Sequence, residues 1–311
     1  MKIISYIAPA KAILSGEHAV VYGKPGLVSA INLTMQFAVW NDVNKNIDKA
    51  IEHIDNTVQN YLKKESINYH KKQFNFSILS NIPIGQNLGS SAALCVSASA
   101  ALLEFYTDRQ FNKDAVNSVA YQAEKYFHKN ASGVDVSTSC HGGLIYYRKE
   151  FEFLKTISAL HQKLPKKFED NLFLINSGKA METTGDMVDR MGKLYNAKPE
   201  KTEKILNEIE KITKRMVVSV IKEDDVYFKK NISDNEILLE KLGVVSTRAI
   251  KLLKQLSSYG AGKMTGAGGI KQGSGFLIFY ADKPQELIDF LNKQKITFYK
   301  FRQNQTGLQR L

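Results

Sequence analysis

A glycine- and serine-rich turn over residues 82–93 is the part of the sequence best suited to chemistry. It lies between an expected strand and an expected helix of small residues that runs to about Tyr106. A turn of this composition at a helix N-terminus leaves backbone N–H groups free, and the helix dipole adds partial positive charge, so it favours phosphate. The alternative is an ordinary loop whose serines cap the helix. The expected phosphate-binding residues are Pro83, Gly85, Asn87, Leu88, Gly89, Ser90, Ser91 and Ala92.

No conventional nucleotide motif competes with this turn. Residues 260–264 come closest to a P-loop, but neither Ser nor Thr follows Lys263 and the required earlier glycine is missing. A Rossmann fingerprint is absent as well. Within the turn, Asn87 adopts a positive φ more readily than most residues other than glycine, so it can serve as part of the same turn.

Three further segments carry ionisable residues among apolar or small neighbours. Near the N-terminus these residues are Lys11, Glu17 and His18, which are either solvent-facing strand residues or a functional cluster. In the middle of the chain, Asp135 stands among small and hydroxyl residues, where it either caps a helix or acts in a site. The glycine-rich run at 263–269 can equally be a flexible turn. Taken singly, each of the three is a weak signal.

The spacing of apolar residues indicates which elements must position these segments. Strands and helices do not alternate strictly, which favours α+β layers over a doubly wound parallel sheet. A polar stretch at 161–170 containing Pro165 suggests a boundary between halves 1–165 and 166–311. The expected strands cover 2–8, 18–23, 27–40, 74–80, 142–148, 171–176, 274–281 and 296–301. Besides the small-residue helix, the expected helices cover 47–62, 113–128, 186–195, 205–220, 246–256 and 285–293.

Composition excludes several classes of protein. Cys95 and Cys140 are the only cysteines in 311 residues and form no CxxC pair, which argues against a disulfide framework or a cysteine zinc site and favours a reducing compartment. The N-terminus lacks the features of a secretory signal, so we expect a cytoplasmic protein. The uncharged stretch 73–103 contains an apolar part too short to span a membrane.

The net charge of +12 raises the possibility of nucleic-acid binding. However, 36 of the 43 basic residues are Lys and they are scattered along the chain, whereas base readout and phosphate forks favour Arg. We therefore expect no nucleic-acid partner and no membrane partner. A basic nucleic-acid binder stays open as an alternative.

The four segments, in this order and roughly at this spacing, resemble the GHMP kinase family, named for galactokinase, homoserine kinase, mevalonate kinase and phosphomevalonate kinase. The resemblance covers about residues 8–280, and the run Gly16-Glu17-His18-Ala19-Val20-Val21-Tyr22-Gly23 is most similar to that of the mevalonate kinases. It implies a two-domain α+β fold with a ribosomal protein S5 domain 2-like N-terminal half, which binds ATP, and a ferredoxin-like C-terminal half. It also implies ATP-dependent phosphorylation of the 5-hydroxyl of mevalonate, with Mg²⁺. A homodimer is a further expectation.

The resemblance further implies roles for individual residues. Asp135 matches the catalytic aspartate that accepts the proton of the substrate hydroxyl, and Lys11 matches the lysine beside it and the transferring phosphoryl group. A cation in this position keeps the carboxylate ionised and also favours the developing alkoxide. Glu124 and Ser91 match the family's magnesium ligands. The residues implied to face the phosphoryl acceptor are Glu17, His18 and Thr184.

The sequence departs from the family at two places. Asn87 stands where the family usually has Gly, and residues 270–275 intervene between the C-terminal glycine run and the strand that follows it. Two alternatives to a mevalonate kinase stay open: another small-molecule kinase of the family, such as a phosphomevalonate kinase, and a catalytically inactive ligand sensor.

Overall fold

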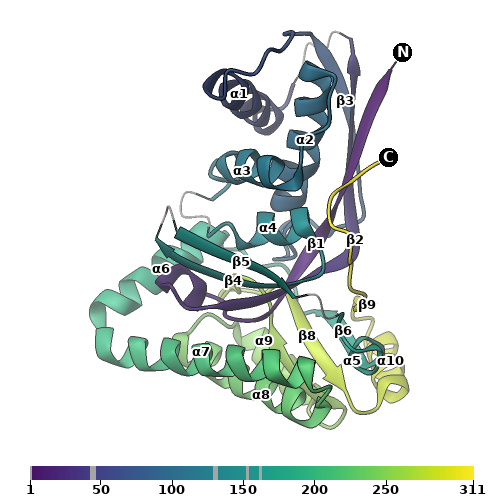
Figure 1. Cartoon of the computed structure of the whole chain (residues 1–311). Coiled ribbons are helices and arrows are strands. Elements are labelled where there is room, and N and C mark those ends of the chain that lie inside the picture. The colour runs from purple at the N-terminus through teal and green to yellow at the C-terminus, as the bar shows by residue number, and fades with distance from the viewer. Residues whose placement is uncertain (1, 43–46, 129–131, 152–153, 161–162) are drawn as a thin grey trace.

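The computed structural model describes residues 2–42, 47–128, 132–151, 154–160 and 163–311 (Figure 1). Its first sheet is antiparallel and runs in the order β10-β1-β2-β4-β5, with β3 pairing the outer half of β2. The strands are β1 (Ile3–Ser15), β2 (Gly26–Asn41), β3 (Phe74–Ser80), β4 (Leu144–Phe151), β5 (Leu154–Leu160) and β10 (Gln309–Arg310). Four helices cover one face of this sheet, namely α1 (Lys49–Lys64), α2 (Ser90–Thr107), α3 (Lys113–Glu124) and α4 (Val134–His141).

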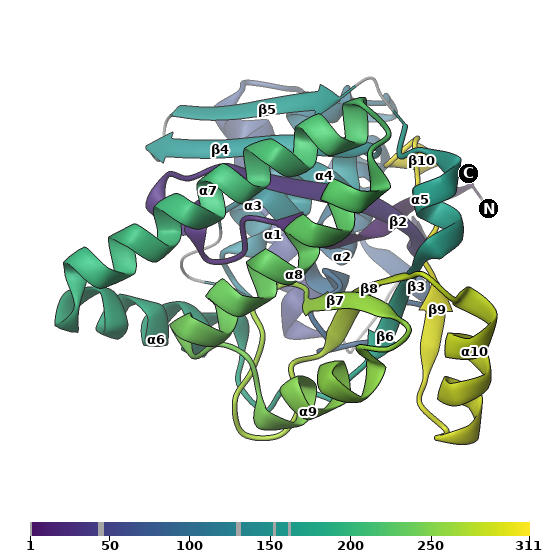
Figure 2. The same cartoon turned by 90° about the horizontal axis from the view of Figure 1, so that it is seen from below.

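The second sheet is also antiparallel, in the order β7-β8-β6-β9. Its strands are β6 (Leu172–Asn176), β7 (Gly260–Met264), β8 (Phe276–Ala281) and β9 (Phe298–Lys300). Figure 2 shows the long helices of this half crossing below the two sheets. The helices are α5 (Lys166–Asn171), α6 (Thr184–Ala197), α7 (Pro199–Ile221), α8 (Asp225–Leu242), α9 (Thr247–Leu256) and α10 (Pro284–Lys293).

Helix α2 is the central helix of the first half. Its small and apolar side chains are buried on nearly all sides, because it packs on β1 and β2 and is covered by α1, α3 and α4. A helix that is apolar all round is stable only when enclosed in this way. Its burial fixes its N-terminus, where the glycine- and serine-rich turn lies.

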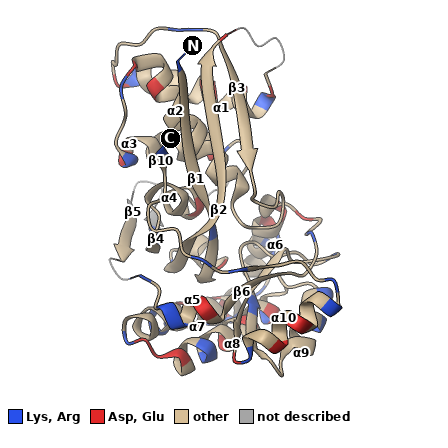
Figure 3. Ribbon diagram, turned by 90° about the vertical axis from the view of Figure 1, so that its right-hand side faces the viewer, with Lys and Arg blue, Asp and Glu red and all other residues tan. Residues whose placement is uncertain are grey.

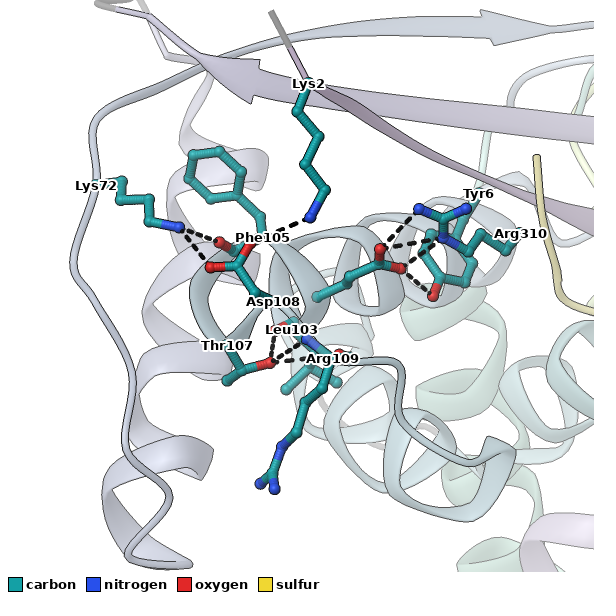
Figure 4. A network of polar contacts seen from close by, with 10 residues as sticks. Lys2, Tyr6, Lys72, Leu103, Phe105, Thr107, Asp108, Arg109 and Arg310 are labelled. Carbon is teal, nitrogen blue, oxygen red and sulfur yellow. Dashed lines mark hydrogen bonds and ion pairs between the residues drawn. The ribbon is translucent and has the colours of Figure 1, made fainter.

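The far end of α2 is fastened by a polar network (Figure 4). Glu104 is the single charged residue of the helix, and it accepts hydrogen bonds from Arg310 at 2.8 Å and from the Tyr6 hydroxyl at 2.7 Å. Lys2 and Lys72 lie 3.2 and 3.1 Å from Asp108, which follows the helix. Strands β1 and β10, which contain Tyr6 and Arg310, are thereby bound to the helix whose N-terminus carries the turn.

One hydrophobic core connects the two sheets. It contains residues of β1, β2 and α2 together with Met216 and Val220 of α7, Phe228 of α8 and Ile278 of β8. Among the described residues, no helix combines the length and apolar character needed to cross a membrane. Figure 3 shows Lys and Arg interspersed with Asp and Glu along the helices of the second half.

The structure confirms the α+β class but corrects several predicted elements. The predicted strand at 18–23 is wrong: residues Ala19–Tyr22 form a 3₁₀ turn, η1, because His18 and Gly23 have φ of 59° and 75°, which extended backbone cannot accommodate. Strand β1 extends well past the predicted end at residue 8, and α3 ends at Glu124 instead of residue 128. Elements α4, α5, α8, β5, β7 and β10 were not predicted.

Of the suggested boundary stretch 161–170, residues 161 and 162 lie outside the described part of the chain, and α5 begins at Lys166. The division into domains 1–165 and 166–311 stays a prediction.

Candidate active site

A cavity of about 620 Å³ lies where the glycine- and serine-rich turn meets the start of α4 and two loops of the second half, at 179–184 and 266–267. Most of the residues singled out in the sequence line it: Lys11, His18, Gly85, Asn87, Gly89, Ser90, Ser91, Glu124, Asp135 and Thr184. Four do not line it, namely Pro83, Leu88, Ala92 and Glu17. Leu88 and Ala92 are buried and face the core instead.

The turn has the backbone form expected of an anion site. Gly85, Asn87 and Gly89 all have positive φ, of 70°, 66° and 77°, and α2 begins at the next residue, Ser90. Among the described residues, no side chain caps this helix end, so the first N–H groups of α2 are available to a ligand. The positive φ expected for Asn87 is therefore present.

The asparagine side chain also connects the turn to the second half. Asn87 Nδ2 donates hydrogen bonds to the carbonyls of Gly268 and Ser274, each at 3.1 Å. Gly266 packs so closely that a Cβ on it would lie 2.7 Å from Asn87 Cβ. A glycine at position 87 would make neither hydrogen bond, so this departure from the family pattern supplies a tie between the two halves.

Lys11 and Asp135 form an ion pair at the cavity wall, with Nζ 3.1 Å from Oδ2. The Lys11 side chain is only 3 % exposed, whereas that of Asp135 is 27 % exposed and reaches the cavity. Lys11 Nζ also donates to the carbonyl of Asn87 at 3.2 Å, which brings the cation against the turn. Asp135 lies in the first turn of α4, where Gly133 caps the helix without a side chain, so the dipole of α4 stabilises the carboxylate.

Glu124 ends α3 and is almost fully buried, yet it lines the cavity together with Ser91 of α2. Ser91 Oγ lies 3.3 Å from Nε2 of His128, a residue that sequence reasoning missed although it follows Glu124 by one helical turn. Burial lowers the pKa of His128, so its ring is neutral near pH 7. Within the described residues, no group of three or more His, Cys, Asp or Glu side chains forms a metal cluster.

Glu17 occupies a different place from the one that the resemblance implies. It is fully buried outside the cavity and forms an ion pair with Lys263 of β7, which is equally buried. Lys263 also donates to the carbonyls of Ile13 at 3.3 Å and Met264 at 2.7 Å. Burial raises the pKa of Glu17 and Lys263 partly offsets that effect. The glutamate therefore joins the end of β1 to the second sheet and has no direct access to an acceptor.

His18 and Thr184 face the cavity from opposite halves of the chain. The His18 Nε2–H donates to the carbonyl of Ala267 at 2.9 Å, and burial lowers the pKa of this histidine to about 4, so it is neutral. Thr184 is the first residue of α6. The cap of that helix is its neighbour Thr183, which exchanges hydrogen bonds with Asp186, so the Thr184 hydroxyl is not needed as a cap.

Comparison with known proteins gives consistent matches. The family model described as GHMP kinases N terminal domain matches residues 47–143. The mevalonate kinase of Archaeoglobus fulgidus is 32 % identical over 303 residues, covering 89 % of this chain and 93 % of that protein. The mevalonate kinase of Methanocaldococcus jannaschii is 28 % identical over 324 residues, covering 94 % and 97 %. The crystal structure of the Methanococcus jannaschii mevalonate kinase superimposes with a TM-score of 0.75 at 25 % identity, covering 97 % and 98 %.

Proposed function

The chain belongs to the GHMP kinase family and, within it, to the mevalonate kinases, and from this premise we propose that it transfers a phosphoryl group from ATP to the 5-hydroxyl of mevalonate. The observation that carries the proposal is the Lys11–Asp135 pair, held beside an uncapped helix N-terminus in one cavity. Phosphoryl transfer demands in-line positioning and neutralisation of charge more than covalent chemistry. A cation, a carboxylate and free N–H groups in one cavity supply both.

The turn at residues 85–91 is the proposed site for the phosphates of ATP. Its N–H groups and the dipole of α2 attract the anion without a charged side chain. Lys11 adds a positive charge beside the turn, since its Nζ lies 3.2 Å from the carbonyl of Asn87. None of Pro83, Leu88 and Ala92 lines the cavity, and Pro83 has no backbone N–H, so a contact of these three residues with the phosphates stays a prediction.

Glu124 and Ser91 fit the requirements of Mg²⁺. Both residues line the cavity with hard oxygen donors, one a nearly buried carboxylate and the other a hydroxyl. This small set is suitable because Mg²⁺ usually takes one or two protein ligands and otherwise water and phosphate oxygens. When bound, the ion would neutralise phosphate charge. His128 orients the Ser91 hydroxyl through the contact of 3.3 Å.

Asp135 is the proposed general base. Its Oδ2 is taken by Lys11, which leaves Oδ1 to accept the proton of the acceptor hydroxyl as that oxygen forms its bond to phosphorus and the bond to the ADP oxygen breaks. Lys11 keeps the carboxylate ionised and stabilises the developing charge on the acceptor oxygen. The acceptor would contact His18 and Thr184, whereas Glu17 acts only by fastening the segment that carries His18.

The test is a panel of acceptors assayed for release of ADP with ATP and Mg²⁺: mevalonate, phosphomevalonate, homoserine and galactose. We expect turnover on mevalonate to exceed that on the others. Turnover on a different acceptor alone would overturn the proposed substrate and leave the family assignment intact. ATP binding without turnover on any acceptor would favour the inactive sensor.

Three other expectations stay predictions. A homodimer is testable by sedimentation velocity, and a cytoplasmic location by fractionation of the source cells. The expected lack of a nucleic-acid partner is testable by titration with duplex DNA and RNA at increasing salt, where a steep loss of affinity would show only nonspecific attraction.

A further inference from the structure

Lys179 lies in the segment between β6 and α6 and lines the cavity from the side of the second half. It is exposed, and among the described residues no hydrogen bond or ion pair joins its ammonium group to a partner. Its side chain lies over Gly85 of the phosphate turn, where a Cβ would be 3.2 Å from Lys179 Cε and 3.8 Å from Nζ. The absence of a side chain at Gly85 leaves this space to the lysine.

The backbone around Lys179 is held by the residues that interrupt the family pattern. Glu182 accepts hydrogen bonds from the N–H groups of Ile270 and Lys271, both at 3.2 Å. Gly273 N–H donates to the carbonyl of Lys179 itself, also at 3.2 Å. The additional loop therefore fixes both ends of the segment 179–182 and keeps Lys179 at the cavity.

The charges of the cavity leave a role for this lysine. Lys11 is already paired with Asp135, and Glu124 and Glu182 add two further negative charges. A triphosphate brings several more negative charges, and hydrogen bonds from cations to such oxygens are stronger than those between neutral groups. We propose that Lys179 is a second cationic ligand of the ATP phosphates, held in position by Glu182 and the loop 270–273. This inference rests on the proposed function for the presence of ATP in the cavity.

The test is the binding of ATP and of inorganic triphosphate to the Lys179→Gln protein, measured by isothermal titration calorimetry without acceptor. We expect the Kd of both ligands to rise about tenfold, because one charged contact is lost, while the Kd of adenosine stays unchanged. Lys179→Arg should recover most of the affinity. The matched control is Lys193→Gln, which removes the same charge from α6 at a neighbouring cavity and should leave all three Kd values unchanged.

Two results would overturn the inference: an unchanged Kd for triphosphate in Lys179→Gln, or an effect equally large in Lys193→Gln. In the ADP-release assay, a rise confined to the KM of the acceptor would be a third contradicting result, since the lysine would then contact the acceptor instead. Because the titration contains no acceptor, its outcome is independent of the acceptor panel. Failure of mevalonate as a substrate and failure of the Lys179 contact are thus separate results.

The positioning role of Glu182 is tested by a double-mutant cycle. We expect Glu182→Gln to weaken triphosphate binding in the wild-type background and to have little further effect once Lys179 is Gln. Equal effects in both backgrounds would show that Glu182 acts independently of Lys179. The proposed role of the loop 270–273 in holding Lys179 in position would then be refuted.

Discussion

Replacing Asp135 with Asn tests the proposed general base while keeping the size of the side chain. The amide cannot accept the proton of the acceptor hydroxyl, so the chemical step should slow by roughly 10² to 10⁴, which is typical for loss of a general base. That range corresponds to about 3 to 5 kcal/mol in the activation free energy. Nucleotide binding should change little, because the turn that holds the phosphates is untouched.

The same substitution removes the counter-charge of Lys11, which is only 3 % exposed and also donates to the carbonyl of Asn87. Breaking a fully buried pair costs about 3 to 5 kcal/mol. The Asp135 side chain is 27 % exposed, so water compensates in part and we expect a loss of about 1 to 3 kcal/mol in the free energy of unfolding.

The assay is single-turnover phosphoryl transfer alongside calorimetric titration of ATP and urea unfolding. The control is Asp114→Asn, which removes an exposed carboxylate that lies outside the cavity. Near-normal turnover in Asp135→Asn would refute the assignment of the base. A parallel collapse of ATP affinity would show that the carboxylate supports the nucleotide site instead.

Three further predictions follow from the buried groups around the cavity. Glu17→Gln leaves Lys263 buried without its counter-charge and should lower the free energy of unfolding, measured by urea titration, by about 3 to 5 kcal/mol. Adding Lys263→Met should recover part of that loss. A double variant no more stable than Glu17→Gln alone would contradict this. Gly89→Ala places a Cβ 2.9 Å from Lys11 Cγ at a residue whose φ is 77°. This change should lower the free energy of unfolding by about 1 to 2 kcal/mol and weaken ATP binding. Unchanged stability and affinity would show that the turn relaxes to accept the side chain. The pKa of His18 is lowered to about 4, so this residue should contribute about 3 kcal/mol to the free energy of unfolding, fully present above pH 6.5 and lost as the pH falls toward 4. His18→Gln should remove that part of the pH dependence of the unfolding free energy. Identical pH profiles for the two proteins would refute the prediction.

Elements with a clear apolar pattern were predictable from the sequence. The alternation of Phe74, Phe76 and Ile78 predicts β3 with both of its ends. Helix α8 escaped prediction because three of its buried positions are polar: Asn231, Asn235 and Glu236. Two of these polar residues bond to partners far away in the sequence: Asn235 accepts from the Ser15 hydroxyl at 2.7 Å and Glu236 from the Met264 N–H at 2.9 Å. Their burial therefore gives the helix no regular apolar pattern in the sequence.

The candidate site shows the same limit. Glycines and Asn87 indicated the turn through their backbone preferences, which are local properties. The burial of Glu17 away from the cavity could not be foreseen, because its partner Lys263 is 246 residues away. In a sequence, an ionisable residue among apolar neighbours looks the same whether it faces a ligand or a buried counter-charge. Lys179 carried no signal at all, since its importance comes from lying over a glycine of a remote segment.

The central claim is that the acceptor hydroxyl meets Asp135 in the cavity between the two halves. It is tested most directly by a crystal structure of the protein with mevalonate and a non-hydrolysable ATP analogue. The account predicts the 5-hydroxyl within hydrogen-bond reach of Asp135 and the phosphates on the N–H groups at the start of α2. A 5-hydroxyl beyond that reach, or phosphates bound away from Ser90 and Ser91, would contradict it.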